Sequence, residues 1–188
     1  YLEGVGGFVA WCQRNGFEPN KTAKVYVATN KKYTAFRHGG LIDGRVKLRQ
    51  TFKDVYLDKL FYLDFYSIER FGKTKLGAML LYAKQGQDRR LIKKIVEMTK
   101  EAIKRLIKSE NIQAVGFVPP TVERRVQLQK ELEKIYAFSL PKIKIFKATN
   151  QIAVPQKSLN KLPDRITNAQ NTIFVAETAP FKTILLID

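Results

Sequence analysis

The chain has 188 residues, of which 45% are hydrophobic and 27% are charged, and its formal net charge is +17. This balance is typical of a folded globular protein and argues against a disordered chain. No apolar run approaches the roughly 20 residues of a membrane span.

Cysteine and histidine are nearly absent from the chain. Cys12 is the only cysteine, which excludes an intramolecular disulfide and a cysteine-based zinc site. His38 is the only histidine, so a catalytic pair of histidine and carboxylate has little support. Both counts are typical of a reducing compartment. We therefore expect a cytoplasmic protein that holds no zinc and has no metal site of its own.

Residues 1–83 are predicted to form a β-rich, basic N-terminal portion. Residues 24–29 and 33–37 alternate as strands do, and they flank Asn30-Lys31-Lys32, which suits a hairpin turn. Two further strands are predicted over residues 45–52 and 60–68, where aromatic and β-branched residues are frequent.

The positive charge is concentrated in this portion. Residues 21–53 contain nine basic residues and one acid, Asp43, with aromatic residues between them. Such a segment could bind a polyanion such as single-stranded nucleic acid through phosphate contacts and base stacking. The candidate contacts are Lys31, Lys32, Arg45 and Lys47. A lysine-rich surface that only keeps the protein soluble explains the same charge, and the sequence leaves both interpretations open.

Residues 84–188 are predicted to form an α/β domain with a parallel sheet. Asp88 is suited to cap an amphipathic helix that ends near Asn111. A strand follows over residues 112–118, a second helix over 121–138 and another strand over 142–147. Residues 149–172 are polar and irregular, and residues 183–188 are predicted as a central strand covered on both faces. This alternation of strands and helices favours right-handed crossovers and a parallel sheet.

Two positions at the carboxyl ends of these strands are candidate binding sites. Pro119 and Pro120 close the strand over 112–118, and Thr121 is predicted to begin the next helix, with Arg124 and Arg125 one turn further on. A helix N-terminus with two arginines is suited to phosphate, although an ordinary helix start with exposed arginines has the same pattern. Asp188 follows the last strand, at the sheet edge where α/β proteins bind ligands.

Two segments together resemble the type I phosphoribosyltransferases, and most closely their competence protein F-like (ComF-like) branch, which is related to amidophosphoribosyltransferases. They are Gln156-x2-Leu159-x5-Arg165-x2-Asn168-x5-Phe174 and the strand that ends at Asp188. The family's strand continues into a second acid and a Gly/Thr-rich loop that binds the 5-phosphate of phosphoribosyl pyrophosphate (PRPP). Only the first acid is present here, so we expect the natural protein to continue past Asp188.

The resemblance implies a glycosyltransferase that uses PRPP with Mg²⁺, transfers its phosphoribosyl group to an acceptor and releases pyrophosphate. It further implies a link to DNA uptake in competent bacteria. Asp188 would bind the ribose hydroxyls. Arg165 would clamp phosphate from a mobile hood over Gln156–Phe174, with Asn168 as a hydrogen-bond donor. Lys84 resembles the lysine before the family's first core helix, and the stretch from Pro119 to Arg125 resembles its pyrophosphate loop. The alternative is a non-catalytic, single-stranded nucleic-acid-binding module on the same fold.

Overall fold

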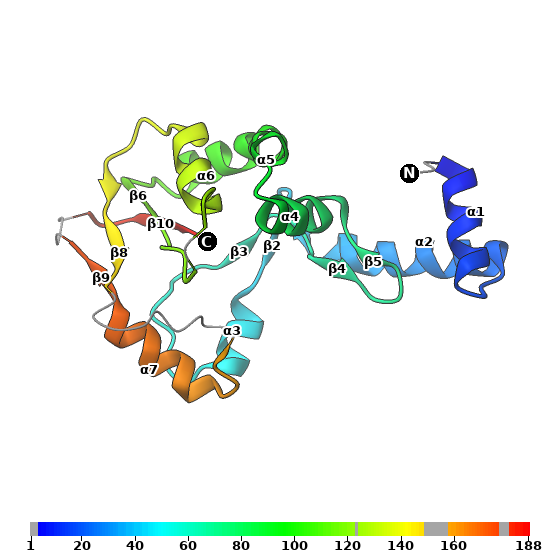
Figure 1. The fold of residues 1–188 in the computed structure, drawn as a ribbon, viewed down its shortest axis with the longest axis horizontal. Helices are drawn as coiled ribbons and strands as arrows, with labels where there is room; N and C mark the ends of the chain where they lie inside the picture. The colour runs from blue at the N-terminus through cyan, green and yellow to red at the C-terminus, as the bar shows by residue number, and fades with distance from the viewer. Residues whose placement is uncertain (1–3, 123, 149–157, 177–180) are drawn as a thin grey trace. The chain divides into compact units, whose positions relative to one another are not determined.

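The computed structural model describes residues 4–122, 124–148, 158–176 and 181–188. The chain forms two compact units, Tyr1–Ala78 and Met79–Asp188. They divide within helix α4 (Lys75–Gly86), the helix in which the boundary predicted after residue 83 also falls. The described residues have a mixed α/β fold with seven helices and a small parallel sheet (Figure 1).

Helices dominate the first unit, in contrast to the predicted β-rich portion. They are α1 (Gly4–Arg14), α2 (Pro19–Ala35) and α3 (Arg45–Thr51). The hairpin predicted around Asn30 is therefore wrong, as is the strand over residues 45–52. Glu18 begins α2 by accepting the N–H groups of Asn20 and Lys21, and Pro19 occupies the first turn.

Aromatic contacts explain why the helix is favoured over the strand at α2. Tyr26 and Tyr33 are seven residues apart, so they share one face of the helix. Tyr26 packs edge-on against Phe71 and Tyr33 against Phe65, with ring centroids 4.9 and 4.6 Å apart. A strand would place the two rings on opposite faces, because side chains alternate along a strand and seven is odd. The start signals at Glu18 and Pro19 favour the helix as well.

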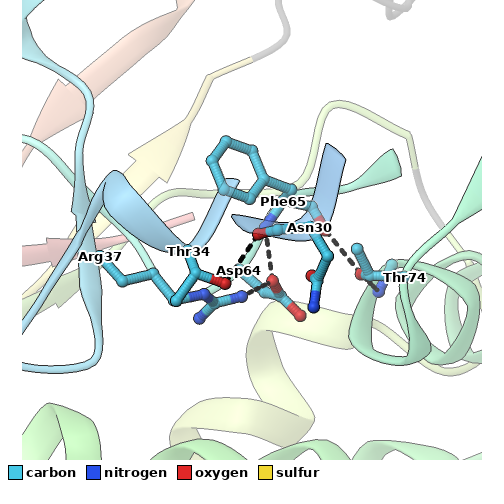
Figure 2. Close-up of polar contacts among 7 residues, drawn as sticks. Asn30, Thr34, Arg37, Asp64, Phe65 and Thr74 are labelled. Atoms are coloured by element: carbon cyan, nitrogen blue, oxygen red, sulfur yellow. Dashed lines mark hydrogen bonds and ion pairs between the residues drawn. The ribbon is translucent and has the colours of Figure 1, made fainter. Parts of the chain in front are cut away.

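The strands of the first unit are short. β1 (Arg37–His38), β2 (Leu41–Asp43) and β3 (Phe61–Tyr62) form an antiparallel sheet, and β4 (Ser67–Ile68) pairs with β5 (Gly72–Lys73). The strand predicted over residues 60–68 is thus interrupted. At the interruption, Asp64 forms an ion pair with Arg37 and also accepts the N–H of Phe65 at 2.8 Å (Figure 2).

Thr74 connects this interruption to the start of α4. Its hydroxyl donates to the carbonyl of Phe65 at 2.6 Å and accepts the N–H of Gly77 at 3.0 Å (Figure 2 shows the first contact). A Cβ at residue 77 would lie 2.1 Å from the carbonyl oxygen of Tyr66. Only glycine therefore allows this close approach of the two backbones.

The second unit begins with α5 (Arg89–Ser109), and its predicted cap is confirmed. The Asp88 carboxylate accepts the N–H groups of Arg90 and Leu91 at 2.8 and 3.3 Å. These bonds, of which the one to Arg90 is the stronger influence, lower the pKa of Asp88. Asn111 has a positive φ of 50° just after the helix, which suits the predicted helix end.

The parallel sheet contains β6 (Ala114–Phe117), β7 (Lys142–Ile143) and β10 (Ile184–Ile187), in the order β10-β6-β7. Its pairing confirms the predicted parallel sheet. The central strand is β6, and all four of its residues are buried. β10 lies at an edge, with Ile184 and Leu186 41% and 47% exposed, so the prediction of a central strand covered on both faces is wrong within the described chain.

The remaining elements differ from the prediction at their ends. α6 (Leu128–Tyr136) begins seven residues after Thr121, and Lys144 separates β7 from β8 (Ile145–Lys147). β8 pairs with β9 (Ile173–Val175) in a ribbon outside the parallel sheet. Residues 149–157 lie outside the described residues, but the end of the predicted irregular stretch is helix α7 (Leu162–Thr172).

Candidate functional site

The carboxyl ends of β6 and β10 meet at one edge of the sheet. Phe117 lies opposite Ile187 in the parallel register, and the N–H of Val118 donates to the carbonyl of Ile187 at 2.8 Å. Asp188 and Pro119 therefore leave the sheet side by side, as predicted for two segments that serve one site. Asp188 is exposed, whereas Pro119 is half-buried.

Residues 119–122 and 124–127, which lie between β6 and α6, are non-helical. The helix N-terminus expected at Thr121 is thus wrong, and Arg124 and Arg125 lie before α6 rather than in it. The reason is that α6 gains its buried face only from Leu128 onward, where Leu128, Gln129 and Leu132 enter the core. Thr121 therefore has no helix dipole with which to attract a phosphate group.

Two hydrogen bonds hold this segment against the junction of α4 and α5. The Arg124 guanidinium donates from Nη1 to the carbonyl oxygen of Lys84 at 2.5 Å. The Val126 N–H donates to the side-chain oxygen of Gln87 at 2.8 Å. The structure therefore brings the Arg124 guanidinium to the backbone of Lys84. Arg125 follows Arg124 in the sequence and is exposed.

Gln87 is a site residue that the sequence reasoning missed. It has a φ of 52°, which is uncommon for a residue other than glycine, and it forms the bend between α4 and the cap at Asp88. Its side chain then reaches across 39 positions of sequence to Val126. The sequence signal was the short stretch Gly86-Gln87-Asp88 between two helices, which predicts a sharp turn but not its partner.

Arg165 and Asn168 lie on α7, which Figure 1 shows continuing from one end of the β8–β9 ribbon. Arg165 Nε donates to the carbonyl of Leu159 at 2.7 Å, and Thr172 donates to the carbonyl of Asn168 at 2.5 Å. These bonds are local to the helix. The amide nitrogen of Asn168 is buried and has no hydrogen-bond partner among the residues that the structure describes.

The basic candidates of the first unit lie on two helices instead of strands. Lys31 and Lys32 are exposed on α2, and Lys47 is exposed on α3. Arg45 already has a partner, because its guanidinium donates to both carboxylate oxygens of Asp43 at 2.6–3.1 Å. These bonds lower the pKa of Asp43 to about 2.

Asp43 and Arg45, with Val46, Arg49 and Gln50, line an open pocket of about 400 Å³. Its carboxylate, Asp43, is paired with Arg45, and Arg49 and Gln50 complete its polar lining. The pocket therefore offers no unpaired carboxylate to a ligand, and it lies in a different unit from the strand ends of β6 and β10.

Within the described ranges, no cluster of three or more His, Cys, Asp or Glu side chains is placed to hold a metal ion. Of the helices that the structure describes, none has the length and apolar character needed to cross a bilayer. No protein-family model, curated protein or solved structure matches the chain.

Proposed function

We propose that this protein binds the magnesium complex of PRPP at the carboxyl edge of its parallel sheet and transfers the phosphoribosyl group to an acceptor. The observation that carries the proposal is the register of β6 and β10, which brings Asp188 and Pro119 out of the sheet together. A ligand whose pyrophosphate and ribose are held by different groups needs two such segments at one edge. The sequence resemblance supplies the identity of the ligand.

Each half of the site has a distinct role. Arg124 and the backbone N–H groups of Thr121, Val122 and Arg125 bind the pyrophosphate end, together with the side chain of Lys84. Asp188 accepts hydrogen bonds from the ribose hydroxyls. The bond from Arg124 to the Lys84 carbonyl supports this assignment, because it fixes the guanidinium beside the backbone of Lys84 before any ligand arrives.

In the transfer, a lone pair of the acceptor attacks C1 of the ribose, and the bond from C1 to the pyrophosphate oxygen breaks. The electron pair of that bond leaves with pyrophosphate, so negative charge grows there as the sugar becomes cationic. Arg124 and the backbone N–H groups stabilise the growing charge. No side-chain nucleophile takes part.

Calorimetric titration with two ligands tests this division. Magnesium PRPP and magnesium pyrophosphate share the pyrophosphate group, but only PRPP has the ribose. We expect Arg124→Gln to weaken both ligands by about tenfold or more, because a charge-assisted hydrogen bond contributes about 1.5–3 kcal/mol. Asp188→Asn should lower the affinity for magnesium PRPP and leave the affinity for magnesium pyrophosphate unchanged.

Arg105→Gln is the matched control, since it removes the same charge from an exposed position on α5. It should leave both affinities as they are. Absence of binding heat with magnesium pyrophosphate would refute the proposal, and so would an Asp188→Asn variant that weakens both ligands equally.

A further inference from the structure

We infer that the lysine face of α2 is a binding surface for single-stranded nucleic acid, an activity separate from the proposed PRPP site. The surface consists of Lys21, Lys24, Lys31 and Lys32, with Phe36 at its end. All five side chains are exposed.

The helical geometry places the four lysines together. At about 100° per residue, Lys21, Lys24, Lys31 and Lys32 fall within roughly 100° of the helix circumference. They extend along about 16 Å of its axis, at 1.5 Å per residue. The opposite side carries Tyr26 and Tyr33, which are engaged with Phe71 and Phe65. One side of α2 is thus committed to packing, and the other presents a row of cations.

This row lacks the acids that normally accompany exposed lysines. α2 contains no Asp or Glu, and none of the described ion pairs involves any of its four lysines. Glu18 lies just before the helix, but its carboxylate caps the first turn by accepting the N–H groups of Asn20 and Lys21. Glu18 is thus the one acid near the row, and its charge acts on Lys21 and Lys24 at the start of the helix. Four lysines against one carboxylate leave a local excess of positive charge.

The long basic helix of the second unit shows the contrast. α5 also carries many basic residues, but Glu97 and Glu101 lie among them on its exposed side, and Glu101 pairs with Lys104 at 2.9 Å. That mixture is typical of a solvated helix surface. Opposite charges in alternation do not favour a polyanion, whereas the uninterrupted row on α2 does.

Phe36 indicates a single strand rather than a duplex. It lies four residues after Lys32 and keeps a helical backbone conformation, so the two side chains are neighbours. Phe36 is 60% exposed, although its ring packs against that of Phe65, with the ring centroids 6.3 Å apart. An exposed ring beside a row of cations is suited to stack an unpaired base while the lysines neutralise phosphates. The stacked bases of a duplex leave no free face for such a ring.

Fluorescence anisotropy of the whole protein with a labelled oligothymidylate of about 20 nucleotides tests the inference. In the variant Lys21→Gln/Lys24→Gln/Lys31→Gln/Lys32→Gln, four phosphate contacts should be lost. The slope of log K against log salt should then flatten by about 2.8, from ~0.7 per contact. At about 0.1 M salt this corresponds to a loss of two to three orders of magnitude in affinity. Glutamine is a good helix former, so α2 should persist, which circular dichroism checks.

The matched control is Lys93→Gln/Lys94→Gln/Lys100→Gln/Lys108→Gln on α5. It lowers the formal net charge from +17 to +13, as the α2 variant does. We expect it to leave the slope nearly unchanged. An equal loss in both variants would overturn the inference, since net charge alone would then explain binding. Tighter binding of anionic lipid vesicles than of the oligonucleotide would also overturn it, in favour of a membrane surface.

Phe36→Leu separates stacking from charge. It retains an apolar contact for Phe65 and removes the aromatic face, so affinity for the single strand should fall about tenfold, within the range of ~1–3 kcal/mol per stacked base. Affinity for a duplex of the same length should not change. An equal effect on both forms would overturn the assignment to single strands.

Discussion

Gln87 combines two features that can be separated by mutation. Its backbone has a positive φ of 52°, and its side chain holds the N–H of Val126. Gln87→Ala keeps the unfavourable backbone and loses the hydrogen bond, so it should destabilise the protein by about 1 kcal/mol. Gln87→Gly loses the same bond but relieves the backbone, which costs about 1 kcal/mol for a residue with a Cβ. Urea denaturation should therefore show a smaller loss for glycine than for alanine.

The affinity for magnesium pyrophosphate provides the second measurement on these variants. Both variants lose the bond that holds Val126 at the junction of α4 and α5. Both should therefore lower the affinity for magnesium pyrophosphate to a similar degree, despite their different stabilities. An affinity that followed stability instead would show that Gln87 only supports the fold and does not position the site.

For single residues, the sequence predicts contacts between positions a few residues apart. Asp88 is recognisable as a cap because it directly precedes an amphipathic run, and its bonds reach only two and three residues ahead. The bond from Gln87 to Val126 spans 39 residues, and the bond from Arg124 to Lys84 spans 40. No local pattern encodes such contacts, because they depend on how α5 returns the chain to the sheet.

Among the elements, α5 and α6 are joined by one buried polar contact. The hydroxyls of Thr99 and Tyr136 lie 2.5 Å apart, and both residues are 3% exposed. Thr99 donates its single hydroxyl hydrogen to the carbonyl of Ile95 at 2.6 Å, so the Tyr136 hydroxyl is the donor between the two helices. Burial raises the pKa of Tyr136, and the bond to Thr99 partly offsets this.

This direction of donation predicts unequal effects of two nearly isosteric changes. Tyr136→Phe leaves Thr99 with its bond to Ile95, so it should lower the free energy of unfolding by about 1 kcal/mol. Thr99→Val leaves a buried tyrosine hydroxyl without an acceptor and should cost more, up to about 3 kcal/mol. The double variant should recover part of that loss. Urea denaturation measures all three, and equal effects of the single changes would contradict the assigned direction.

The same scale shows which elements were predictable. α5, β6 and β10 were placed correctly because a long 3.6-residue period and short apolar runs leave little ambiguity. α2 was misread because Val25, Tyr26 and Val27 favour strands when taken alone. The cap at Glu18 and the seven-residue spacing of Tyr26 and Tyr33 favour the helix. At α6 only Leu132 of the predicted inward residues is buried, because the buried face of the helix begins at Leu128.

For the molecule as a whole, the meeting of two strand ends was predictable, whereas the composition of the first unit was not. Neighbouring parallel strands place their carboxyl ends at one edge, whatever their side chains. That rule was sufficient to bring Asp188 beside Pro119. The first unit follows no such rule, because its short strands and three helices pack around individual aromatic contacts.

The two inferred activities lie in different units, which predicts that they can be separated. The lysine face belongs to Tyr1–Ala78, and the PRPP site to Met79–Asp188. A chain that begins at Thr74 keeps α4 with its capping hydroxyl, together with the core of α5, α6 and β6. We expect it to fold by circular dichroism and to bind magnesium pyrophosphate as the whole protein does. It should lose most of its affinity for single-stranded DNA.

The charge of the shortened chain makes this comparison informative. Residues 74–188 contain 21 basic and 10 acidic residues, so a formal net charge of +11 remains. If nucleic acid were attracted by net charge alone, the shortened chain would still bind it with a steep dependence on salt. Retained binding would therefore contradict the assignment to α2, whereas loss of pyrophosphate binding from a folded chain would contradict the site at the sheet edge. Because each result concerns a different unit, failure of one proposal leaves the test of the other intact.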